Sequence, residues 1–188
     1  MGKVDFKPGN MLYPLPVVMV SVADASGRSN ILTVAWTGTI NSAPPMISIS
    51  VRKERFSYKM LMESKEFCVN LTDRELTYAT DLCGVKSGAK TDKWREAHLT
   101  PEPCSVISCP MISESPVNIE CKVTKTEDLG SHVIFFGTVV AVHADSKYMD
   151  EHNTFHFEDC DPITYSHGRY YTLGECIGKF GYSVKKSK

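Results

Sequence analysis

The chain has 188 residues, of which 42% are hydrophobic and 23% are charged, with 21 Lys and Arg against 22 Asp and Glu. This composition excludes disordered and fibrous proteins, and the length suits one domain with a sizeable core. The net charge of −1 lacks the basic excess of a nucleic-acid binder. No apolar run reaches the ~18 residues of a membrane span, and the polar start is unlike an export signal. We therefore expect one cytoplasmic domain over 1–188, with a flexible tail over 183–188 and neither nucleic-acid nor membrane partners.

Two nearly continuous apolar segments come first, at 16–22 and 31–36, and a turn at 24–29 joins them. They are rich in β-branched residues and predict two strands of a hairpin with both faces covered. Strict alternation of apolar and polar residues follows at 47–52, 67–72 and 117–124, as in half-buried strands. A longer strand is expected over 132–144, with Gly137 marking a bulge or bend.

Helices are expected to be few and short. We predict one over 57–64, one that begins at a capping box of Thr72 and Glu75 and stops at Gly84, and weaker ones over 91–97 and 146–155. The proline-rich stretch 100–116 is expected to be loop or edge. Six or seven strands with short helices between them predict a mainly β fold, a barrel with helical insertions.

The seven cysteines are odd in number and lack C-x2-C spacing, the closest pair being Cys104 and Cys109. This argues for reduced thiols rather than a disulfide framework or a zinc site. Motifs for Rossmann, P-loop and α/β-hydrolase chemistry are also lacking.

Three segments could build a ligand site. Arg52, Arg55 and Ser57 end a strand and open a helix, which suits a phosphate, although a solvated basic turn has the same pattern. The segment 87–93 combines a Ser-Gly turn with a lysine, or is only a surface turn. The strand 28–38 has a face of small residues on which a flat ligand could lie, unless that face packs against a neighbouring sheet or subunit.

The order of these segments resembles the flavin reductase-like, FMN-binding split-barrel family, and within it the flavoredoxin subgroup. The resemblance spans about residues 10–180 and rests on the successions at 27–36, 42–45, 47–51, 55–57, 67–71, 87–88 and 92–93. It implies a split β-barrel of Greek-key type with six to seven antiparallel strands, a homodimer, and bound FMN. The cofactor-binding residues it implies are Asn30, Leu32, Thr33, Ala35, Trp36, Thr37, Arg52, Arg55, Ser57, Ser87, Gly88 and Lys93.

The resemblance further implies an oxidoreductase that passes electrons from NAD(P)H or a redox partner protein through FMN. A non-catalytic flavin-binding module, an electron carrier and an FMN-dependent ferric reductase stay open as alternatives. No catalytic residue follows from the pattern, and His167, in a polar-aromatic loop near the end of the chain, is the one candidate. His152 and His156 have helical metal-ligand spacing but no further recognisable ligands, so no metal is expected.

Overall fold

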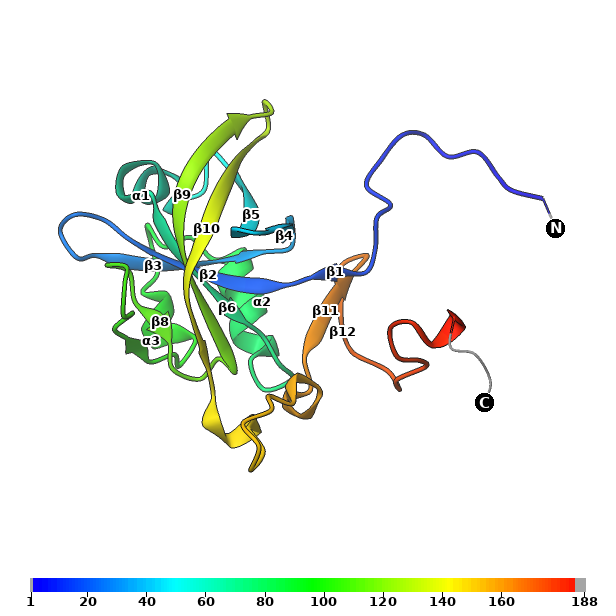
Figure 1. Ribbon diagram of the computed structural model, residues 1–188. Helices are drawn as coiled ribbons and strands as arrows, with labels where there is room; N and C mark the ends of the chain where they lie inside the picture. Colours follow the sequence, from blue (N-terminus) through cyan, green and yellow to red (C-terminus); the bar gives the residue numbers. More distant parts are fainter. Residues whose placement is uncertain (1, 185–188) are drawn as a thin grey trace.

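A computed structural model describes residues 2–184. Its main feature is a seven-stranded antiparallel sheet in the order β3-β2-β6-β9-β10-β5-β4, which curls into a barrel (Figure 1). The barrel is split between β3 and β5, which approach each other without pairing. The seven strands are β2 (Val18–Ala23), β3 (Ser29–Val34), β4 (Thr37–Ser42), β5 (Pro45–Arg52), β6 (Glu66–Leu71), β9 (Val117–Asp128) and β10 (His132–Ala144).

The expected mainly β, split-barrel fold is confirmed, and six of the seven strands lie where alternation or β-branched runs predict them. Strand β4 was missed. It is the edge strand of the sheet and its last four residues are exposed, so its sequence carries no apolar alternation. The β2–β3 hairpin and the coverage of both faces of β2 are as predicted.

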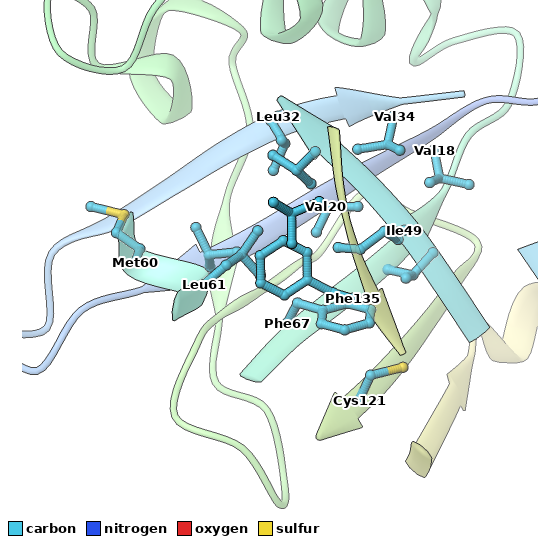
Figure 2. Packing of buried hydrophobic residues seen from close by; sticks show 14 residues of the cluster. Val18, Val20, Leu32, Val34, Ile49, Met60, Leu61, Phe67, Cys121 and Phe135 are labelled. Carbon is cyan, nitrogen blue, oxygen red and sulfur yellow. The ribbon is translucent and has the colours of Figure 1, made fainter. Parts of the chain in front are cut away.

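The barrel interior holds the main hydrophobic core (Figure 2). Phe67 of β6 and Phe135 of β10 lie side by side at its centre, and both are fully buried. Leu61 closes one end of the core from helix α1 (Ser57–Ser64), the predicted helix with the predicted bounds. The core therefore fixes α1 against the barrel, and with it the turn that leads from β5 into α1.

Gly137 lies at a register shift between β9 and β10, as predicted. A Cβ atom at this position would lie 2.6 Å from the ring of Phe67 and 3.0 Å from Cβ of Cys121. We expect Gly137→Ala to lower the free energy of unfolding by about 1–3 kcal/mol, because the core must shift to admit the methyl group. Urea denaturation measures this. Gly38→Ala is the control, since a Cβ there meets nothing within 4 Å; an equal effect of both variants would contradict the steric explanation.

The outer faces of β6 and β9 are covered, although the alternation predicts half-buried strands with one face open to solvent. Asn70, Asn118 and Glu120 occupy the polar positions of the alternation, yet all three are buried. The segment 100–116 covers them. Within this segment, the short strands β7 (Pro101–Glu102) and β8 (Met111–Ile112) pair with each other. Alternation predicts which residues share a face, but it cannot tell whether a loop covers that face.

The other helices depart from prediction at their ends. Helix α2 (Thr77–Val85) starts later than the capping box predicts: Thr72 donates to the carbonyl of Val17, and the carboxylate of Asp73 accepts from the amide of Leu76. Helix α3 (Lys93–Glu96) begins after Asp92, whose side chain caps it. The helix predicted for 146–155 is wrong, because only a 3₁₀ turn, Ser146–Tyr148, forms there.

A small three-stranded sheet completes the fold, formed by β1 (Leu15–Pro16), β11 (Ile163–Ser166) and β12 (Arg169–Thr172). From it, the segments 2–14 and 173–184 leave the barrel on the same side (Figure 1). Two further 3₁₀ turns span Phe157–Cys160 and Tyr182–Val184. Of the predicted flexible tail, residues 185–188 lie outside the described residues. No helix within 2–184 is long and apolar enough to cross a membrane.

Candidate functional site

Two adjoining pockets open at the split of the barrel. The first, here the polar pocket, is a cavity of about 180 Å³ at the start of α1. The second, here the aromatic pocket, has about 390 Å³ and lies along β3 and the end of β5. Leu32, Arg52 and Arg55 line both pockets, so the two form one continuous site.

Lys93 is the decisive residue of the polar pocket. Its side chain is only 4% exposed, and its ammonium donates to the carbonyls of Ile31, at 2.7 Å, and Cys83, at 2.8 Å. An ammonium has three N–H donors, so one is left for the pocket. Burial lowers the pKa of Lys93 to about 8; Cys83 opposes this shift and Arg55 adds to it. No carboxylate within 2–184 pairs with this buried charge, which therefore favours an anion in the pocket.

Asn30 and Ser57 form the floor of the polar pocket. The amide of Asn30 donates to the hydroxyl of Ser57 at 2.7 Å, and both side chains are buried. Gly88 lies against Asn30 so closely that a Cβ would come within 2.1 Å of Asn30 Oδ1. Glycine therefore lets the 87–88 turn approach β3 and leave its backbone exposed to the pocket, as the Ser-Gly pattern predicts.

Two arginines stand at the junction of the pockets. Arg55 donates to the carbonyl of Gly84 at 2.8 Å, which holds its guanidinium against α2. Arg52 pairs with Glu54 at 2.7 Å, and both side chains are exposed. Arg55 is thus fixed in position, whereas Arg52 has one surface partner that an incoming anion can replace.

An aromatic pair marks the outer rim of the aromatic pocket. The rings of Trp36 and His132 stack with centroids 6.4 Å apart and planes 9° apart, and Trp36 is 42% exposed. Thr33 and Ala35 line the pocket beside them, and the hydroxyl of Thr33 is bound to the carbonyl of Thr80. The result is a flat, partly apolar wall suited to a planar ligand.

Sequence reasoning missed His132 and two tyrosines of this pocket. His132 begins β10 directly opposite Arg52 on β5, so the pairing register was the signal that could have found it. Tyr165 and Tyr170 face each other across the β11–β12 hairpin, and Tyr170 donates to Asp81 of α2 at 3.0 Å. Burial, followed by Asp81, raises the pKa of Tyr170 to about 12.

Two predicted residues lie beside this site rather than in it. Thr37 donates to the carbonyl of Ser48 at 2.8 Å and lines a neighbouring groove between β4 and the segment 9–15. His167 is at the tip of the β11–β12 hairpin, with its ring 4.2 Å from that of Tyr13, and it lines neither pocket. Its catalytic role stays a prediction. The other eleven predicted cofactor-binding residues line one pocket or both.

His152 and His156 are not on a helix. His156 contacts the carboxylate of Asp150 at 3.0 Å, which raises the pKa of that imidazole, and His152 is exposed. No group of three or more His, Cys, Asp or Glu side chains in the described part of the chain is arranged to hold a metal ion.

Comparison with known proteins decides the family. The model of the flavin reductase like domain matches residues 10–174. The chain belongs to the flavin reductase-like family. This flavin-binding family is the one that the order of the sequence segments predicts, and the match includes every residue of the two pockets.

This flavin reductase-like chain is similar to three proteins whose names indicate flavin chemistry. The structure of flavoredoxin of Desulfovibrio vulgaris (Miyazaki F) superposes with a TM-score of 0.90 at 28% identity, covering 98% of this chain and 100% of that one. Flavoredoxin from Methanosarcina acetivorans gives 0.86 at 26% identity, with the same coverage. A flavin reductase (NADH) of Kitasatospora aureofaciens is 29% identical over 131 residues, covering 68% of this chain and 65% of its own.

Proposed function

We propose that this chain is an FMN-dependent oxidoreductase of the flavin reductase or flavoredoxin type, which passes electrons from NAD(P)H or a redox partner protein through FMN. The buried ammonium of Lys93 carries the proposal. Its hydrogen-bond partners among residues 2–184 are two carbonyls, and it faces the polar pocket, which continues into the aromatic pocket. A planar ring system linked to a terminal dianion satisfies both halves of this site, and FMN has that construction.

The polar pocket would hold the phosphate. Lys93, Arg55 and Arg52 supply cations, and charge-assisted hydrogen bonds to phosphate are about twice as strong as neutral ones. The hydroxyl of Ser57 and the 87–88 turn add neutral donors. Lys93 lines the polar pocket alone and the two arginines stand where it joins the aromatic pocket, so the charged end of the ligand is oriented into the polar pocket, at the start of α1.

The aromatic pocket would hold the ring. Leu32 lines both pockets, and with Asn30 of the polar pocket and Thr33 of the aromatic pocket it would follow the ribityl chain. Ala35 and Trp36 lie at the ring end. When bound, a flavin supplies two-electron and one-electron transfer through its ring. The residues of this chain then need only bind it, orient it and leave one face open to the electron donor.

The buried lysine makes the binding of FMN dependent on pH. Lys93 has a pKa of about 8, below its ordinary 10.5, so it loses its proton in the free protein as the pH rises through 8. A bound phosphate favours the protonated form, so binding above pH 8 takes up a proton and becomes weaker. We expect the Kd for FMN to rise by about fivefold between pH 8 and 9. Fluorescence titration measures it, and riboflavin, which lacks the phosphate, should show no such dependence.

Anaerobic addition of NADH and NADPH to the FMN-loaded protein tests the activity. Rapid bleaching of the flavin by NADH or NADPH alone supports a flavin reductase. Bleaching that also requires a partner reductase supports an electron carrier, which the proposal includes. If FMN binds but neither route reduces it, the chain is a non-catalytic flavin-binding module and the proposed activity is wrong. Adding a ferric chelate to the reduced protein then tests the ferric reductase alternative.

We further propose that the chain is a homodimer. Large apolar side chains are exposed on both segments that leave the barrel, which is unfavourable in a monomer. Light scattering coupled to size exclusion should give twice the 20.9 kDa of one chain, and a monomer mass at micromolar concentration would contradict it. The exposed apolar residues are Val4, Phe6, Met11, Leu12, Leu173, Ile177 and Phe180.

A further inference from the structure

Three thiols meet beneath the 100–116 segment. Cys68 on β6 and Cys109 in the segment belong to one buried apolar cluster, and Cys104 packs against that cluster. None of the three lines the polar or the aromatic pocket, so the cluster is separate from the proposed flavin site.

The loop that carries Cys104 is held in place by a buried carboxylate. Glu120 of β9 accepts hydrogen bonds from the amides of Ser105, Val106 and Ile107 and contacts His143 at 2.6 Å. This anchor starts at the residue directly after Cys104, so it fixes the position of that cysteine over β6. A positioned thiol that packs against a cluster holding two further thiols is an arrangement from which a reversible disulfide can form.

Access differs among the three thiols. Cys68 and Cys109 are buried, whereas Cys104 is only half-buried. A small reagent can therefore reach Cys104 first, and the product is in contact with a second thiol that can resolve it. The groups facing Cys104 are Cys109, Cys68, Glu120 and His143. The hydrogen bonds from Cys109 and then Cys68 lower the pKa of Cys104, and His143 adds to this, against the effects of burial and Glu120.

We propose that Cys104 and Cys109 form a thiol–disulfide site that reacts with low-molecular-weight disulfides. The Cys104 thiolate attacks one sulfur of the small disulfide RSSR, forming a mixed disulfide and releasing one thiolate. The thiol of Cys109 then attacks the Cys104 sulfur, and its proton passes to the leaving thiolate, which departs as RSH. Two protein thiols are oxidised to one disulfide, and RSSR is reduced to two RSH.

Peptide mapping of the full chain tests this. The reduced protein is treated with oxidised glutathione, alkylated and digested with trypsin, which leaves Cys104, Cys109 and Cys121 in one peptide, 96–122, and Cys68 in another, 66–74. We expect a disulfide within peptide 96–122, located between Cys104 and Cys109 by fragmentation. A cross-link between the two peptides, or an unmodified peptide 96–122 alongside glutathionylated Cys176, overturns the proposal.

Variants separate the two steps. Cys109→Ser should retain glutathione on Cys104, because the second attack is lost, and Cys104→Ser should show neither product at the cluster. Cys176→Ser, at an exposed thiol outside the cluster, is the control and should leave the yield of the disulfide unchanged. A disulfide between Cys104 and any other cysteine of the chain in Cys109→Ser, in place of bound glutathione, would assign the resolving thiol to another residue and contradict the proposal.

The rate of alkylation gives a second readout that needs no variant. An ordinary thiol with a pKa of about 8.5 reacts about 80-fold more slowly at pH 6 than at pH 8. Because its neighbours lower the pKa of Cys104, we expect a smaller decrease than this for its reaction with iodoacetamide over the same range. An 80-fold decrease at Cys104 would contradict the assignment of this residue as the attacking thiol.

Discussion

Replacing Glu120 with alanine is expected to lower the free energy of unfolding by about 3–5 kcal/mol, as breaking a buried charged network does. The carboxylate is fully buried and accepts from the amides of Ser105, Val106 and Ile107 at 2.7–3.0 Å. Its removal leaves these donors, and the ring of His143, without their acceptor. Urea denaturation measures the loss.

Two further variants separate charge from shape. Glu120→Gln keeps the volume but loses the charge and some acceptors, so we expect a loss of about 1–3 kcal/mol. Glu127→Ala, on the exposed part of the same strand, should change stability by less than about 0.5 kcal/mol. If Glu120→Ala is as mild as Glu127→Ala, the 100–116 segment is not held by this carboxylate.

The buried carboxylate of Glu120 should also make the stability of the protein sensitive to acid. Burial alone raises the pKa of Glu120, but the contact with His143 and the donors of Ser105 and Val106 outweigh it and lower the pKa to about 2. A carboxyl whose pKa is lowered on folding stabilises the protein above its ordinary value of 4.5, and the stabilisation is lost as the pH falls towards 2. Glu120→Gln should remove this part of the pH dependence, and an unchanged acid profile would contradict it.

The second large effect is a loss of FMN affinity when two cations of the polar pocket are removed. Arg55→Ala combined with Lys93→Ala should weaken FMN binding by about 3–5 kcal/mol, since each change removes a charge-assisted contact to the phosphate. Because Lys93 also bonds the carbonyls of Ile31 and Cys83, its loss affects folding as well. Binding must therefore be measured on protein whose melting shows a folded state, with Lys93→Met as the less disruptive variant.

Riboflavin distinguishes a lost phosphate contact from a damaged pocket. It shares the ring and ribityl chain of FMN but lacks the phosphate, so the double variant should bind it nearly as well as the unmodified protein does. Lys59→Ala, an exposed lysine on α1 outside both pockets, should leave both affinities unchanged. An equal loss for riboflavin and FMN would mean that the phosphate lies elsewhere.

Much of the fold could be predicted because local patterns determine it. β-Branched runs and alternation found six barrel strands, and helix α1 has the predicted bounds because Ser57 follows a strand and Met60 and Leu61 face the core. Strand β4 could not be found, since an exposed edge strand needs no apolar alternation. The burial of Glu120 was also beyond reach, because it depends on where a distant loop folds.

The site was predicted in its residue types rather than in its contacts. The order of the segments located Arg55, Ser57, Gly88 and Lys93, which the structure brings to one pocket. That Lys93 is buried, with two carbonyl partners, follows from packing between β3 and α2 and has no signal in the sequence. His132 reaches the site through strand pairing, which links positions far apart in the chain.

Titration of the purified protein with FMN, FAD and riboflavin measures whether the site recognises the phosphate of FMN. We expect one FMN to bind per chain, much more tightly than riboflavin at pH 7, with the difference shrinking above pH 8 as Lys93 loses its proton. A protein that stays colourless with saturating FMN, or that binds riboflavin as tightly as FMN, would contradict it.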